Sequence, residues 1–251
     1  QSVGGGSRTD APLAVTKLPS GHVYLVNGYH RLVDAMQAGK DTVSVESHLD
    51  IRAAYLSAEE LKLAASLLFQ SYHDDPVFLD VFNSEKEGYE QRIRASIREE
   101  LSAFWQAKQP MVGVFLADTL VGVACLNSPD DSVGSERFWH WRLKMLLTAG
   151  YFSTKQMIEK EQKVMAAVPL KKFHMLSFIA IHPLHQHHGL GHYLMAAVDT
   201  VLKEHGDSEG VAVYATSGKF RAFFEDANYE FIQDVSVGKV SGALMVHYRN
   251  K

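Results

Sequence analysis

The chain has 251 residues, of which 46% are hydrophobic and 22% are charged, and its formal net charge is -4. That length suffices for one domain plus an appendage, and the composition is ordinary for a globular protein. The charge offers no general basic surface, so nucleic acid is disfavoured as a partner, and no apolar run reaches the roughly 18 residues of a membrane span. Cys125 is the only cysteine, which excludes an intrachain disulfide and favours a reducing compartment, the cytoplasm.

The N-terminal part predicts a small unit of its own. Residues 1–19 are typical of a loop, residues 22–26 of a strand, 31–38 of a helix ended by a glycine, and 42–45 of a second strand. We therefore expect a strand–helix–strand appendage over residues 1–47 and a larger domain over residues 48–251.

The larger domain predicts alternating strands and helices. A strand at 50–55 precedes a helix whose capping box is formed by Ser57 and Glu60, and Asp75-Pro76 ends the helical stretch that follows. The later elements are a helix at 89–105, a hairpin of strands 111–116 and 120–126, helices 136–149 and 154–168, strand 173–181, helix 191–205, strand 211–215, helix 219–227, and strands 231–237 and 242–248. This order predicts a mixed sheet with helices on both faces.

A glycine-bearing loop joins strand 173–181 to helix 191–205. It consists of Gln186, His187, His188, Gly189, Leu190 and Gly191. The free N–H groups and the dipole of a helix N-terminus favour an anion, and glycines let the backbone approach it closely. The loop therefore predicts a site for a phosphate-bearing cofactor.

Residues 173–191 resemble the acetyl-CoA motif of the GNAT family of N-acetyltransferases. In that family a hydrophobic strand and a Val/Ile-x-Pro turn lead to Gln/Arg-x-x-Gly-x-Gly/Ala at a helix start. Here the turn reads Ile-His-Pro at 181–183 and the loop reads Gln-His-His-Gly-Leu-Gly at 186–191. The order of elements over 48–250 is also similar. The resemblance implies an α/β (α+β) fold with a mixed, mainly antiparallel sheet flanked by helices.

The resemblance also implies an activity, the transfer of an acetyl group from acetyl-CoA to a primary amine of a small molecule or of a protein or peptide. The oligomeric state stays open, with a homodimer as one option. In the strand Ile179-Ala180-Ile181, the backbone would hydrogen-bond the pantetheine arm, and the N–H groups from His187 to Gly191 would hold the pyrophosphate. Ser217 and Lys219 would lie near the coenzyme.

One position departs from the family pattern. Members often carry a Tyr that protonates the leaving thiolate, and Phe224 stands at that position here, with Asn228-Tyr229 in place of Gly-Phe. Tyr229, Tyr214 or water are the alternative proton donors. His174, which begins the same strand as the motif, is the first candidate for the general base, because histidine titrates near neutral pH.

Three further patterns carry two interpretations each. Glu159 and Glu161 are weaker candidates for the base, or mark the solvated face of their helix. The histidines around the loop suggest a metal, but charge beside a pyrophosphate explains them better, so we expect no metal site. The aromatic helix 136–149 either faces the core or forms a wall of the acceptor pocket.

A shorter resemblance, to part of the ParB/sulfiredoxin-like fold, covers residues 22–45. It depends on Asn-Gly-Tyr-His-Arg at 27–31 and on the strand that ends at Val45. It implies a truncated module, or a nucleotide site built from Gly28, His30 and Arg31. The rival to an acetyltransferase is therefore a non-catalytic acyl-CoA sensor or a nucleotide-binding regulatory protein.

Overall fold

The computed structural model describes residues 13–17, 23–27, 37, 45–47, 51–129, 149–186 and 189–249. These residues belong to two compact units, one of residues 1–52 with 115–118 and one of residues 53–114 with 119–251.

The first unit contains a three-stranded sheet in the order β2-β1-β3. Strand β1 (Leu13–Lys17) pairs antiparallel with β2 (Val23–Asn27) and parallel with β3 (Val45–Ser47). The prediction of a loop over residues 1–19 is therefore wrong at β1, whose Val15 and Thr16 are β-branched and suit a strand. Most of the predicted helix 31–38, and residues 42–44 of the predicted second strand, lie outside the described residues.

The main sheet has seven strands in the order β4-β5-β6-β7-β8-β10-β9. It confirms the mixed, mainly antiparallel sheet with flanking helices, and the elements follow the predicted order closely. Their bounds are β4 (Ile51–Tyr55), η1 (Ala58–Glu60), α2 (Leu61–Tyr72), α3 (Pro76–Val81), α4 (Tyr89–Gln106), β5 (Met111–Leu116), β6 (Thr119–Asn127), α6 (Tyr151–Ala167), β7 (His174–Ile181), η2 (Pro183–His185), α7 (Leu190–Glu204), β8 (Gly210–Ala215), α8 (Gly218–Asp226), β9 (Glu230–Val237) and β10 (Val240–Tyr248). Most of the predicted helix 136–149 lies outside the described residues.

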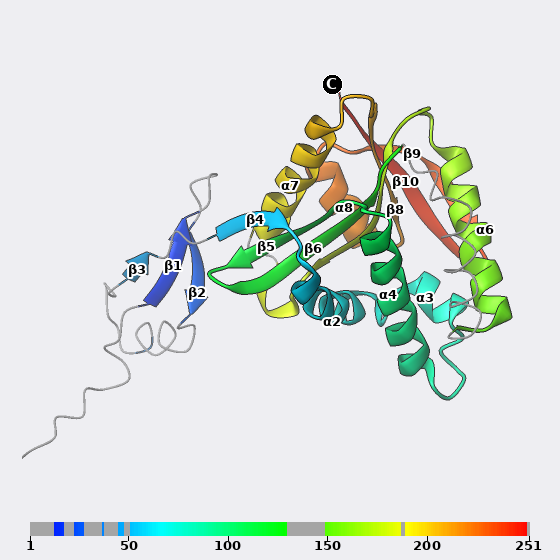
Figure 1. The fold of residues 1–251 in the computed structure, drawn as a ribbon, viewed down its shortest axis with the longest axis horizontal. Helices are drawn as coiled ribbons and strands as arrows, with labels where there is room; N and C mark the ends of the chain where they lie inside the picture. Colours follow the sequence, from blue (N-terminus) through cyan, green and yellow to red (C-terminus); the bar gives the residue numbers. More distant parts are fainter. Residues whose placement is uncertain are drawn as a thin grey trace, which may run out of the picture. The chain divides into compact units, whose positions relative to one another are not determined.

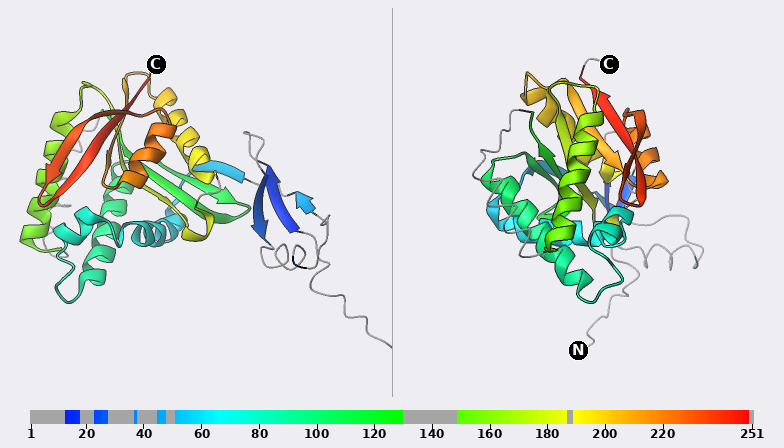
Figure 2. Two further views of the ribbon diagram at one scale, coloured as in Figure 1. Left: turned by 180° about the vertical axis from the view of Figure 1, so that it is seen from behind. Right: turned by 90° about the vertical axis from the view of Figure 1, so that its right-hand side faces the viewer.

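Helices cover both faces of this sheet (Figures 1 and 2). Helix α7 packs against β6 and β7 on one face, where its apolar stripe of Leu190, Leu194, Val198 and Val201 is buried, and α8 packs against β8 and β9. Helix α2 packs on α4 and on the other side of β6 and β7, and α6 lies along β9. Within the described ranges, no helix is both long and apolar enough to cross a membrane.

The central strands β7 and β8 separate part of the way along their length. They pair in parallel only from His174–Val211 to Leu176–Val213. Immediately afterwards, Ser177 is an extra residue in β7 relative to β6, because Phe178 faces Cys125 while Leu176 faces Leu126. Such a bulge bends a strand and strengthens its twist. From Phe178 to Ile181, β7 is paired with β6 but not with β8.

Candidate active site

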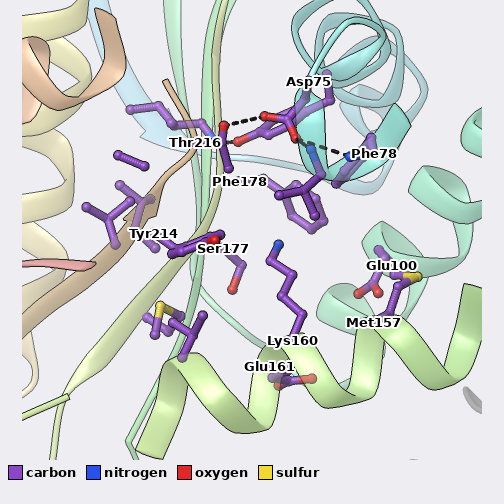
Figure 3. Close-up of a pocket in the computed structure, with 18 of the residues that line it drawn as sticks. Asp75, Phe78, Glu100, Met157, Lys160, Glu161, Ser177, Phe178, Tyr214 and Thr216 are labelled. Carbon is purple, nitrogen blue, oxygen red and sulfur yellow. Dashed lines mark hydrogen bonds between the residues drawn. The ribbon is translucent and has the colours of Figure 1, made fainter. Parts of the chain in front are cut away.

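A cavity of about 150 Å³ lies where β7 and β8 separate (Figure 3). Apolar and aromatic side chains from both faces of the sheet form much of its wall. The polar side chains Asp75, Glu100, Lys160 and Tyr214 also line it, and Glu161 lies at its exposed rim. The cavity therefore combines a free strand edge with ionisable groups in an enclosed space, as small-molecule sites commonly do.

The backbone N–H of Ile179 points into this cavity, where it donates to the hydroxyl of Tyr72 at 3.0 Å. The Tyr72 ring is held by Phe78, with ring centroids 5.1 Å apart, and by Phe178 at 5.7 Å. Burial raises the pKa of the Tyr72 phenol strongly, against a smaller opposing effect of the Ile179 amide. The hydroxyl therefore stays protonated, and its oxygen accepts the hydrogen bond of the Ile179 N–H, which an oxygen of a ligand could accept instead.

Asp75 joins the first helices to the end of β8. Its Oδ1 accepts hydrogen bonds from the N–H groups of Val77 at 2.9 Å and Phe78 at 3.2 Å, so it caps α3, whose first residue is Pro76. Its Oδ2 accepts a hydrogen bond from the hydroxyl of Thr216 at 2.5 Å (Figure 3). The buried Asp75 carboxylate therefore fixes one wall of the cavity.

The other wall carries the carboxyl group of Glu100 and the amine of Lys160, and the pKa values of both groups are shifted. Burial, aided by the negative charge of Glu161, raises the pKa of Glu100 to about 8. Burial lowers the pKa of Lys160, although Asp75, Glu100 and Glu161 act in the opposite direction. Perturbed groups that share a cavity are typical of active sites.

Phe224 of α8 stands at the position where the family that the sequence resembles often has a proton-donating tyrosine. Phe224 is buried, lines the cavity and packs on Phe223 and Tyr229, so it offers a ring and no proton. Tyr214 lines the same cavity, and its hydroxyl donates to the carbonyl oxygen of Val235 at 2.8 Å. Burial raises the pKa of Tyr214, which makes it a weak proton donor.

The structure places the predicted phosphate loop at the start of α7. Gly189 is the residue before the helix and has φ of +83°, which favours glycine. A Cβ at Gly191 would lie 2.6 Å from Phe223 Cε2, so close packing of α7 on α8 also requires a glycine there. Gln186 Nε2 donates to the carbonyl oxygen of Ile181 at 3.1 Å and ties the loop to the end of β7. His187 and His188 lie outside the described residues.

Of the predicted strand residues, Ile179, Ala180 and Ile181 pair with Ala124, Val123 and Gly122 of β6. Along their other edge, these three residues do not pair with β8. Ser217 caps α8 by accepting from the N–H of Phe220 at 3.4 Å, and Lys219 belongs to the first turn of that helix.

The structure does not bring the two predicted catalytic residues together. His174 is fully buried where β7 and β8 still pair, and its Nδ1 lies 2.8 Å from the Ser208 hydroxyl. Tyr229 is buried against His247 and lines a different cavity with Asp199. Neither is among the residues that line the cavity of Ile179. His174 is the first residue of β7, whereas the strands β7 and β8 separate only beyond the bulge at Ser177. His174 therefore lies at the other end of the strand from the cavity.

Two patterns left open by the sequence can now be placed. Glu161 reaches the cavity rim, whereas Glu159 is near Lys155 on the surface, with Nζ and Oε1 3.9 Å apart. Among the residues that the structure describes, no group of three or more His, Cys, Asp and Glu side chains is arranged to hold a metal ion.

Sequence reasoning missed Tyr72, Glu100 and Lys160. Each lies on a helix with an ordinary amphipathic sequence, so the local spacing of residues does not distinguish it from other side chains of that helix. Asp75 had a signal, since an Asp before Pro at a helix start predicts a cap, but its bond to Thr216 joins residues far apart in the chain.

The comparisons with known proteins agree with this fold. Among curated proteins, no sequence matches the chain. Solved structures with a similar fold include a histone acetyltransferase HPA2 and related acetyltransferase from Corynebacterium glutamicum (14% identity, 78% of this chain and 94% of that chain, TM-score 0.58). An agmatine N-acetyltransferase mutant (16%, 79% and 100%, TM-score 0.56) and a mosquito arylalkylamine N-acetyltransferase like 5b (16%, 79% and 100%, TM-score 0.52) are also similar.

The sequence profile of the acetyltransferase (GNAT) family matches residues 76–229, which include the bulged strand, the glycine loop and most of the cavity wall. The chain belongs to the acetyltransferase (GNAT) family and is an N-acetyltransferase with acetyl-CoA as its co-substrate.

Proposed function

We propose that the protein transfers the acetyl group of acetyl-CoA to the primary amine of a small, partly apolar acceptor. One observation carries this proposal: the backbone amide of Ile179, which has the Tyr72 hydroxyl and no strand of the sheet as its acceptor, lines the same small cavity as the acidic groups Glu100 and Glu161. Its aromatic wall suits an apolar body, and its carboxyl groups suit an ammonium. Agmatine and arylalkylamine N-acetyltransferases, which share the fold, are named for small amines, and this supports the same acceptor class.

In the proposed complex, the pyrophosphate of the coenzyme lies at the N-terminus of α7, at Gly189 to Gly191. Free N–H groups and the helix dipole favour an anion there. The pantetheine arm runs along Ile179, Ala180 and Ile181, whose edge lacks a partner in β8. The N–H of Ile179 then polarises the thioester carbonyl, as one donor of an oxyanion hole.

Glu100 is the proposed general base. An alkyl ammonium has a pKa of about 10.4 and must lose a proton before it attacks. A carboxylate with a pKa of about 8 accepts that proton far better than an ordinary glutamate, whose value is 4.5. The leaving thiolate needs little help, because a thiol has a pKa of about 8.5. Phe224 at the usual tyrosine position is therefore compatible with turnover.

Titration of the thermal unfolding temperature with acetyl-CoA, CoA and nucleotides tests the ligand class. We expect acetyl-CoA and CoA to stabilise the protein and nucleotides to leave it unchanged. Release of free thiol from acetyl-CoA in the presence of an amine panel then tests turnover. Stabilisation without thiol release for every amine would support the acyl-CoA sensor instead, and stabilisation by nucleotides alone would support the nucleotide-binding alternative.

We also infer a reducing compartment, the cytoplasm, because Cys125 is the only cysteine of the chain and an intrachain disulfide is therefore excluded. Residues 1–47 are proposed as a separate appendage to the acetyltransferase domain at 48–251.

A further inference from the structure

A lysine occupies the space in which an acceptor amine would react. Lys160 extends from α6 into the cavity, and Figure 3 shows its amino group directed towards the end where Asp75 and Thr216 lie. The Nζ atom lies 5.7 Å from the centroid of the Tyr214 ring, on the strand across the gap from β7. The side chain therefore brings a primary amine into the cavity that the Ile179 amide also lines.

Opposing effects act on the charge of this amine. The carboxyl groups of Asp75, Glu100 and Glu161 and the ring of Tyr214 favour the ammonium, but burial outweighs them. Burial lowers the pKa of Lys160, which increases the fraction of neutral, nucleophilic amine at neutral pH. The other lysines of the same helix differ, because Lys155 and Lys163 are exposed.

We propose that Lys160 is a site of self-acetylation, an inference that rests on the proposed acetyl transfer from acetyl-CoA at this cavity. The neutral Nζ attacks the carbonyl carbon of the thioester that is held along β7. The new C–N bond forms, the C–S bond breaks, and the thiolate of CoA takes up the proton that the nitrogen loses. The products are one Nε-acetyl-lysine and one CoA thiol, and no other reactant is needed.

Mass spectrometry of the whole chain tests this inference. The protein is incubated with acetyl-CoA that carries an isotope-labelled acetyl group, without any amine, and its peptides are mapped over time. We expect one labelled acetyl group per chain, at Lys160, formed roughly a hundredfold or more faster than at Lys155 or Lys163, since positioning beside the reacting carbonyl accelerates attack. Acetyl phosphate, which lacks the coenzyme, should instead label lysines according to exposure.

Two variants make the result specific. Lys160→Arg keeps a long basic side chain but removes the nucleophilic amine, so it should lose the label, while Lys155→Arg, a change on the surface of the same helix, should keep it. An added acceptor amine should slow the labelling of Lys160, because both amines compete for one acetyl group. If acetyl-CoA binds and external amines turn over while Lys160 stays unlabelled, the self-acetylation proposal is wrong and the proposed function stands. If acetyl-CoA neither binds nor releases thiol, both are wrong.

Discussion

The hydrogen bond between Tyr72 and Ile179 predicts a specific exchange when acetyl-CoA binds. In the structure, the Ile179 N–H donates to the Tyr72 hydroxyl at 3.0 Å. Tyr72→Phe removes that acceptor and leaves a buried N–H, which costs about 1–3 kcal/mol. The acetyl carbonyl oxygen can restore the bond, but CoA has no such oxygen. The ratio of the Kd for CoA to the Kd for acetyl-CoA should therefore rise about 5- to 150-fold in Tyr72→Phe.

Calorimetric titration of both coenzymes into both proteins measures this ratio. The free energy of unfolding without ligand should also fall by about 1–3 kcal/mol, because the unpaired amide destabilises only the folded state. Tyr89→Phe is the matched control, since the Tyr89 hydroxyl donates to the carbonyl oxygen of His73 at 2.6 Å and Tyr89 does not line the cavity. An equal change for CoA and acetyl-CoA in Tyr72→Phe, or weaker binding of acetyl-CoA alone, would refute the exchange.

The other predictions concern a base, a glycine and a cap. The kcat/KM should rise as the pH rises through about 8, where Glu100 ionises, and Glu100→Gln should be slow and lack this rise; an unchanged profile would exclude Glu100 as the base. A carboxyl pKa raised from 4.5 to about 8 gives stability that is full below 4.5 and is lost as the pH rises through about 8, so chemical denaturation should show Glu100→Gln gaining on the wild type above pH 8 but not at pH 4. Gly191→Glu should abolish acetyl-CoA binding in a fluorescence titration, and Gly191→Ala, which adds the contact with Phe223 but no charge, separates packing from repulsion; wild-type affinity in Gly191→Glu would contradict the placement of the pyrophosphate. Asp75→Ala should lower the free energy of unfolding by about 1–3 kcal/mol, more than Thr216→Val, since only the first loses the cap of α3; equal losses would show that the cap contributes nothing.

The fold of the larger domain is readable from the sequence because its signals are local. The apolar run of β7 and the glycine before α7 each fix an element with its neighbours alone. Asp75-Pro76 predicts only the end of a helical stretch, so the short helix α3 that begins at Pro76 was not predicted. Strand β1 was missed because a short strand with one partner on each side depends on residues distant in the chain.

The cavity was only half predictable, for a related reason. The glycine loop and Ile179 follow from a contiguous motif, but Glu100 and Lys160 reach the site from two different helices. The prediction of His174 as the base came from its position on the motif strand. The bulge at Ser177 determines where that strand opens, and a bulge arises from pairing with β6, which the sequence of β7 alone does not specify.

The early end of the β7–β8 pairing leaves an open seam in the sheet. Backbone groups along a seam inside a fold need partners, and here a side chain, the phenol of Tyr72, serves as one. A molecule that enters the seam with its own amides and carbonyls would replace such a temporary occupant. The coenzyme would then take the place of a strand beside β7. Amide hydrogen exchange at Ile179 and Ile181 should therefore slow in the same acetyl-CoA titration that saturates the enzyme.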